Sequence, residues 1–117
     1  MVSVFLANAS DTFLCLQNDY GQTALHLAVR EDHLAMVSVY TSRGVCLNDA
    51  NKDGDTPLHY SAHWGRPRAA KLLIEAGAKQ MVRNHKGEMP LDDAQAREDS
   101  EMIRILTPGV LLRTDDK

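Results

Sequence analysis

Apolar positions along the chain fall into short blocks with helical spacing. In residues 54–66, GDTPLHYSAHWGR, Leu58 and Ala62 lie four residues apart and so share one face of a helix. Thr56 is a good N-cap residue, and Pro57 suits the first helical position, where its missing N–H would have no partner in any case. These signals predict a first helix of about eight residues.

A second helix is predicted directly downstream. Gly65 ends the first helix and Pro67 can begin the next one, which should end before Gly77. Its apolar stripe is broader and comprises Ala69, Ala70, Leu72 and Leu73. Two short antiparallel helices cannot bury both of these faces alone, so the pattern predicts about three such units stacked on one another.

The same pattern occurs three times at a fixed spacing. GQTALHLAV at residues 21–29 aligns with GDTPLHYSA at residues 54–62 and with GEMPLDDAQ at residues 87–95. The leading glycines, Gly21, Gly54 and Gly87, are evenly spaced along the chain. The downstream segments LAMVSVYTSRG and RAAKLLIEAG keep the same offset, so the whole unit is repeated.

This period and motif resemble the ankyrin-repeat family, whose T-P-L-H-x-A signature stands here at residues 23–28 and 56–61. The resemblance covers about residues 18–106 and implies an all-α solenoid of stacked helix-turn-helix units with projecting hairpin-like loops. The connecting segments, residues 44–54 and 77–87, are rich in the turn formers Gly, Asn and Asp, which agrees with such loops.

The repeats predict where the units begin and end. We expect an N-terminal capping half-repeat at residues 1–17, repeats at 18–50 and 51–83, a C-terminal capping repeat at 84–107, and a tail at 108–117. In the last repeat Met89 replaces the signature Thr and Asp92 the signature His. A more polar last unit is what a solvent-facing cap requires. Its second helix is expected at residues 100–106.

Histidines raise the question of a metal site, because His59 and His63 could share a helix face. The resemblance instead implies that signature residues build the scaffold, with each imidazole hydrogen-bonded to the threonine side chain and to backbone. These residues are Thr23, His26, Thr56 and His59. Zinc needs three or four ligands, and no further residue has the spacing to join the pair, so we expect no metal and no cofactor.

An alternative of another class is a His-dependent metal-binding module that uses His59, His63 and His85. Catalysis is not expected, because the chain has no P-loop, no GxSxG and no GxGxxG motif.

The resemblance places partner contacts on the loop tips and on the exposed ends of the first helices. Carried over position by position, they are Asp19, Tyr20, Gln22, Arg30, Glu31, Lys52, Asp53, Asp55, His63, Trp64, His85, Lys86, Glu88 and Arg97. Trp64 is the residue type that anchors interfaces. The alternative for Trp64 is packing against the neighbouring repeat.

Charge and cysteine usage narrow the class of partner. A net charge of -3 without a basic stripe argues against nucleic acid as the partner, whereas mixed charges suit a protein partner and a chain that is monomeric when unbound.

The apolar start, residues 1–10, is too short to span a membrane. Cys15 and Cys46 lie far apart in the sequence, which argues against a disulfide framework and favours the cytoplasm or nucleus.

Two local resemblances suggest different partners. Residues 16–29, LQNDYGQTALHLAV, are similar to the first repeat of the inhibitor-of-kappa-B family, which masks Rel-type transcription factors. PLHYSAHWG and GEMPLD look like the ankyrin domain of integrin-linked kinase, which implies a LIM-domain-binding adaptor. Asn48 occupies a loop position that is hydroxylated in some ankyrin proteins, and its alternative is a plain turn residue.

Overall fold

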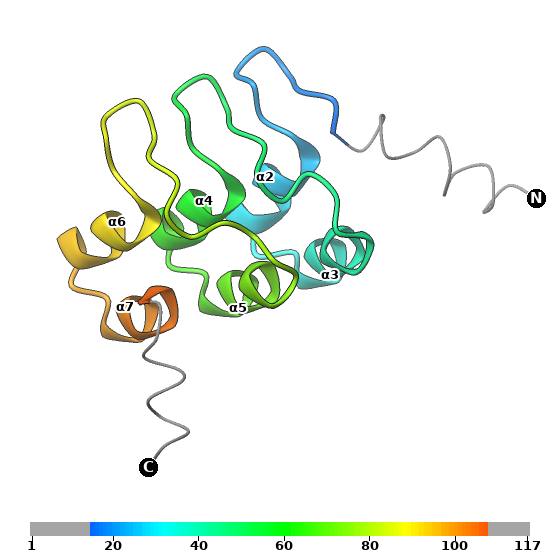
Figure 1. The fold of residues 1–117 in the computed structure, drawn as a ribbon. Helices are drawn as coiled ribbons and strands as arrows, with labels where there is room; N and C mark the ends of the chain where they lie inside the picture. Colours follow the sequence, from blue (N-terminus) through cyan, green and yellow to red (C-terminus); the bar gives the residue numbers. More distant parts are fainter. Residues whose placement is uncertain (1–14, 108–117) are drawn as a thin grey trace, which may run out of the picture.

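The computed structural model describes residues 15–107 as three helix pairs that stack side by side (Figure 1). The pairs are α2 (Ala24–Arg30) with α3 (Leu34–Arg43), α4 (Pro57–Trp64) with α5 (Pro67–Glu75), and α6 (Pro90–Ala96) with α7 (Ser100–Leu106). Helices α2, α4 and α6 form one row and α3, α5 and α7 a second. This confirms the all-α stack of helix-turn-helix units. The tail and most of the N-terminal half-repeat lie outside the described residues.

Capping boxes begin the first helices of repeats one and two. The Thr23 side chain accepts a hydrogen bond from the His26 backbone N–H at 3.3 Å, and the Thr23 backbone N–H donates to His26 Nδ1 at 3.1 Å. Thr56 and His59 repeat this arrangement at the start of α4. In this way the signature satisfies backbone groups that the first turn of a helix would leave unpaired.

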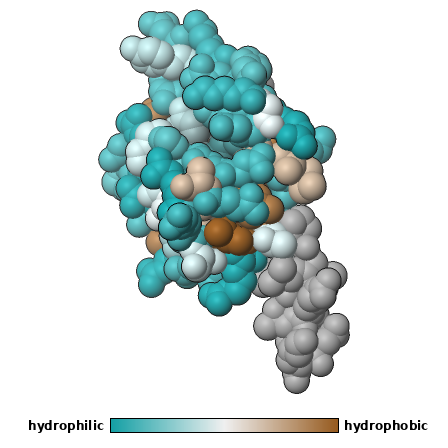
Figure 2. Space-filling view, turned by 90° about the vertical axis from the view of Figure 1, so that its left-hand side faces the viewer, coloured by the Kyte–Doolittle hydropathy of each residue, from teal (hydrophilic) through white to brown (hydrophobic). Residues whose placement is uncertain are grey.

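The last repeat keeps only part of this cap. Met89 has no hydroxyl, but its backbone N–H donates to Asp92 Oδ2 at 2.9 Å, so Asp92 replaces the histidine as the acceptor. The end of the stack formed by α6 and α7 is largely hydrophilic (Figure 2). Gln95, Arg97, Glu98, Glu101 and Arg104 are exposed on it, as a solvent-facing unit requires.

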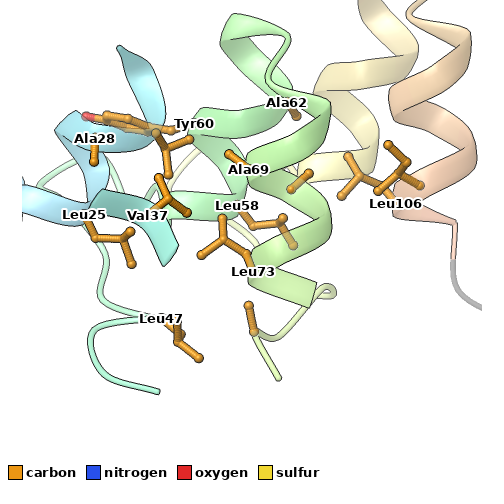
Figure 3. Close-up of a cluster of buried hydrophobic side chains, with 14 of the residues drawn as sticks. Leu25, Ala28, Val37, Leu47, Leu58, Tyr60, Ala62, Ala69, Leu73 and Leu106 are labelled. Carbon is orange, nitrogen blue, oxygen red and sulfur yellow. The ribbon is translucent and has the colours of Figure 1, made fainter. Parts of the chain in front are cut away.

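The core lies between the two rows of helices (Figure 3). Leu25, Leu58, Leu73 and Leu106 are fully or almost fully buried there, and they come from all three repeats. Helix α4 packs against both α2 and α6, and α5 packs against both α3 and α7. Each helix pair is therefore buried by its neighbours, as the apolar pattern predicted.

The two connecting segments and the segment before α2 project from the stack as loops (Figure 1). We name them finger 1 (residues 15–22), finger 2 (residues 44–55) and finger 3 (residues 77–88). Adjacent fingers are hydrogen-bonded: Lys52 N–H donates to the Tyr20 carbonyl at 3.0 Å, and His85 N–H donates to the Asp53 carbonyl at 2.9 Å. At Gly54 the backbone has a φ of 83°, and an added Cβ would lie 2.8 Å from the backbone nitrogen of His85. Glycine therefore permits this close approach.

A disulfide joins Cys15 of finger 1 to Cys46 of finger 2, so the inference drawn from their distance in the sequence was wrong. The two residues are 31 positions apart, close to one repeat, and stacking brings such positions side by side, with a Cα–Cα distance of 5.5 Å. The cysteines therefore no longer argue for a reducing compartment, and the cellular location of the chain stays a prediction.

Candidate recognition surface

A groove of about 450 Å³ lies between fingers 2 and 3, above helices α4 and α6. It is lined by Asn51, Asp53, Asp55, His59, Tyr60, His63, Trp64, Asn84, Lys86, Glu88 and Asp93. Six of these were predicted as partner contacts, namely Asp53, Asp55, His63, Trp64, Lys86 and Glu88. The repeat brings them together because equivalent positions of consecutive units lie side by side.

Tyr60 forms the floor of this region and was not predicted as a functional residue. Its buried hydroxyl accepts hydrogen bonds from Gln22 Nε2 at 2.8 Å and from Asn51 Nδ2 at 2.9 Å. Its ring lies edge-on to His26, with centroids 4.8 Å apart, and tilted against Trp64 at 5.0 Å. Tyr60 thus connects two fingers to helix α4. It stands at the variable position of the signature, so the motif carries no signal for it.

The signature histidines connect each helix start to the next finger. His26 Nε2 lies 2.9 Å from the Asp55 carbonyl oxygen, and His59 Nε2 lies 2.9 Å from the Glu88 carbonyl oxygen. Because Nδ1 of each ring accepts a backbone N–H, Nε2 carries the proton and donates it to the carbonyl. Both side chains are buried and fully hydrogen-bonded. They belong to the scaffold below the groove.

Burial lowers the pKa of His26 from its ordinary value of 6.5. The hydrogen bond to the Asp55 backbone and the carboxylates of Asp49 and Asp55 act in the opposite direction, and His59 acts with burial. The neutral ring is the form that the local hydrogen bonds need, since a proton on Nδ1 would remove the acceptor for the Thr23 N–H.

Trp64 and His63 stand at the exposed end of α4. The Trp64 ring packs against His63 with centroids 4.4 Å apart, and the tryptophan remains 41% exposed. His63 Nδ1 lies 3.2 Å from Asp93 Oδ2, and Arg97 Nε lies 3.5 Å from Asp93 Oδ1. The contact between His63 and Asp93 joins α4 to α6, and the one between Arg97 and Asp93 lies at the end of α6. Trp64 is therefore both packed within its own repeat, through Tyr60, and open to solvent.

The remaining predicted contacts lie on both sides of this groove. Tyr20, Asp19, Lys52 and His85 are exposed on the fingers, and Tyr20 is 71% exposed. Arg30 and Glu31 form an ion pair at the end of α2, with Arg30 Nε 3.0 Å from Glu31 Oε2. Arg97 lines a second cavity with His63 and Trp64. Gln22 is half-buried because its side chain is bonded to Tyr60.

Potential metal ligands converge elsewhere in the described part of the chain. The group found there is Cys15, Cys46 and Asp49, and its two sulfurs are bonded to each other. The structure does not bring His59, His63 and His85 together as such a group.

Asn48 is exposed, and its Oδ1 accepts a hydrogen bond from the Lys79 backbone N–H at 2.8 Å. Within residues 15–107, no helix is both long and apolar enough to cross a bilayer.

Comparison with known proteins yields several relatives. The chain is 40% identical over 91 residues to the mouse nuclear factor NF-kappa-B p105 subunit, covering 75% of this chain and 9% of that protein. It is 36% identical over 102 residues to the Drosophila melanogaster E3 ubiquitin-protein ligase Ufd4, covering 84% of this chain and 4% of the ligase. A putative ankyrin repeat protein of fowlpox virus is 33% identical over 96 residues, covering 78% of this chain and 28% of the viral protein. The chain thus spans a small part of each relative.

The family profile described as ankyrin repeats (3 copies) matches residues 1–84 and 43–115. Ankyrin repeats are protein-interaction modules that generally carry no catalytic chemistry, and the ligase named above shares only a small fraction of its length with this chain. The family match agrees with the regular repeat period, with the capped helix pairs and with the linked fingers. The chain belongs to the ankyrin-repeat family.

Proposed function

We propose that the chain binds a partner protein through the surface formed by the fingers and by the helices α2, α4 and α6. The observation that carries this proposal is Trp64, a large aromatic side chain that remains 41% exposed at the wall of a groove. Partly exposed tryptophans in such positions contribute disproportionately to binding energy when a partner covers them. Polar and charged side chains surround it, which is typical of the rim of a protein interface.

The experiment that tests this function compares two exposed apolar residues. Trp64→Ala should weaken binding of a partner isolated by affinity capture by roughly 2 kcal/mol or more. Met36→Ala is the matched control, because Met36 is 47% exposed on α3, in the other row of helices. Affinity is measured by titration of the purified partner, and thermal unfolding is measured for both variants.

Stability decides how the result is interpreted. Since Trp64 packs on Tyr60 and His63 but is not enclosed, its truncation should lower the melting temperature only slightly. A large loss of stability with unchanged affinity would show that Trp64 serves the scaffold and would contradict the proposal.

A second candidate function is binding of a Rel-type transcription factor. It is supported by the 40% identity to the NF-kappa-B p105 subunit and by the resemblance of residues 16–29 to the first inhibitor-of-kappa-B repeat. A titration with a purified Rel-type dimer tests it, with binding at micromolar concentrations expected. Absence of binding there would contradict this candidate and leave the general function intact. A LIM domain, the other partner suggested by local resemblance, can be titrated in the same way.

A further inference from the structure

Negative charge dominates the groove between fingers 2 and 3. Its lining carries four carboxylates, those of Asp53, Asp55, Glu88 and Asp93, and a single lysine, Lys86. Among residues 15–107, Arg30 forms an ion pair with Glu31 and Arg97 forms one with Asp93, which also lies 3.2 Å from His63 Nδ1. In this part of the chain Asp93 is thus neutralised, whereas three groove carboxylates have no ion-pair partner. A positively charged group is the complement of such a groove.

Trp64 adds a second kind of complementarity. An indole face attracts cations through its quadrupole, more strongly than the rings of Tyr or Phe. Tyr60 and His63 pack against Trp64 and hold it at the groove wall, with ring centroids 5.0 Å and 4.4 Å from it. The ring is therefore held in place before a partner arrives, which reduces the entropy lost on binding.

The carboxylate of Asp55 is held in place in the same manner. Asp55 Oδ1 accepts a hydrogen bond from Asn84 Nδ2 at 2.8 Å, and the Asp55 backbone is bonded to Asn51 and to His26. The groove volume of about 450 Å³ is within the range of pockets that accommodate small organic groups. One long side chain of a partner therefore fits the groove in size as well as in charge.

From these observations we infer that the groove receives a lysine or arginine side chain of the protein partner. Its charged end lies at the face of the Trp64 ring and toward the carboxylates of Asp53, Asp55 and Glu88. The inference rests on the proposed function, and it adds the chemistry of the partner: a segment with a basic residue at one required position. An acidic partner segment is disfavoured by the same charges.

Selection of random peptides displayed on phage tests the required position. Peptides are enriched on the immobilised chain, and after alignment a lysine or arginine should recur at one position. The chain holds a single tryptophan, so intrinsic fluorescence reports on Trp64 when each enriched peptide is titrated. The peptide in which the basic residue is replaced by citrulline or glutamine should bind roughly five-fold more weakly or worse.

Variants of the groove test the charge itself. Asp53→Asn combined with Glu88→Gln removes two carboxylates without shortening either side chain, and it should weaken binding of the basic peptides by roughly five-fold. Glu75→Gln combined with Glu101→Gln is the matched control, because it also removes two exposed carboxylates, on α5 and α7, outside the groove. The control variant should bind as the original chain does. Thermal unfolding of both variants should be nearly unchanged.

The possible outcomes separate this inference from the function on which it rests. Enriched peptides that lack a basic residue but require Trp64 would overturn the inference and leave the binding surface in place. Equal weakening by the groove variant and by the variant with Glu75→Gln and Glu101→Gln would also overturn it, since the effect would then be one of net charge. No enrichment over blank beads would overturn the inference, whereas the proposed function is decided separately by the affinity of the captured partner for Trp64→Ala.

Discussion

At the scale of the residue, His26 shows how one side chain holds two repeats together. Its Nδ1 accepts the Thr23 backbone N–H within its own repeat, and its Nε2 donates to the Asp55 carbonyl of the next finger. The first contact requires the neutral ring, and the second requires a proton on Nε2. A protonated His26 would lose the first contact and would place a charge in a buried site, so stability is coupled to pH.

The sign of this coupling follows from the direction of the pKa shift. Burial lowers the pKa of His26 in the folded chain below its ordinary 6.5, so the unfolded chain binds more protons as the pH falls below that value. The contribution of His26 to stability is complete above about pH 6.5 and is lost progressively below it, toward the lowered pKa. Urea unfolding measured from about pH 7.5 down to pH 5 should therefore show decreasing free energies of unfolding.

The variant His26→Gln tests whether His26 is the group that makes stability depend on pH. This variant should be less stable by about 1 to 3 kcal/mol at neutral pH, because buried hydrogen-bonding groups lose their partner. Its stability should also depend less on pH. His85→Gln, at an exposed position of finger 3, is the control and should keep the original pH dependence. If His26→Gln kept it as well, the assignment to His26 would fail.

At the scale of the element, each finger is organised by an asparagine that recurs once in every repeat. Its Oδ1 accepts hydrogen bonds from the backbone N–H groups two and four residues further on, all at 2.9 Å. The three residues are Asn18, Asn51 and Asn84. These hydrogen bonds fix a tight turn in each finger. The described part of the chain contains no strand, so the turns do not depend on strand pairing. The fingers are thus shaped locally and are then linked to one another by backbone hydrogen bonds.

Asn51 should be the most important of these asparagines. It is nearly buried and also donates from Nδ2 to the Tyr60 hydroxyl at 2.9 Å, whereas Asn18 is exposed. Asn51→Ala should lower the free energy of unfolding by about 2 to 4 kcal/mol, because three hydrogen bonds are lost at a largely buried side chain. Asn18→Ala should cost about 1 kcal/mol or less, since water can replace its bonds. Chemical denaturation checks both, and equal losses would contradict this account.

Helix positions could be predicted from the sequence because their signals are local. Thr56 and Pro57 begin α4, Gly65 ends it, and the expected second helix of the last repeat coincides with α7. Contacts between repeats could not be predicted in the same way. The two hydrogen-bond donors to the Tyr60 hydroxyl are 9 and 38 residues from it, and no local pattern marks such a meeting.

Partner positions were carried over one by one, and the structure shows that they are not equivalent. Trp64, Asp55 and Glu88 line one groove, whereas Arg30 and Glu31 pair with each other at the end of α2. Adjacent fingers are held against one another by backbone hydrogen bonds, and the repeat period and the composition do not specify these bonds.

At the scale of the whole molecule, equivalent positions at the junctions between repeats use different bonds. Asn48 is the equivalent of Cys15 one repeat further on, and Lys79 is in the same way the equivalent of Cys46. The first junction has the Cys15–Cys46 disulfide, and the second has a hydrogen bond from Lys79 N–H to Asn48 Oδ1 at 2.8 Å. A covalent bond therefore replaces, at the N-terminal junction, a polar contact that stacking already brings into place.

The disulfide should stabilise the fold, and the equivalence of the two junctions predicts a position for a second disulfide. For a sequence separation of 31 residues, loss of the disulfide in Cys46→Ser should lower stability by about 3 to 4 kcal/mol through the entropy of the unfolded chain. Asn48→Cys with Lys79→Cys, made in a chain whose Cys15 and Cys46 are serine, should form a disulfide at the second junction and recover part of that loss. Thermal unfolding with and without dithiothreitol measures both effects, and thiol titration counts unpaired sulfurs. Two free thiols in the folded double variant would show that the junctions are not superimposable, because stacking alone would then have failed to bring the second pair within bonding distance.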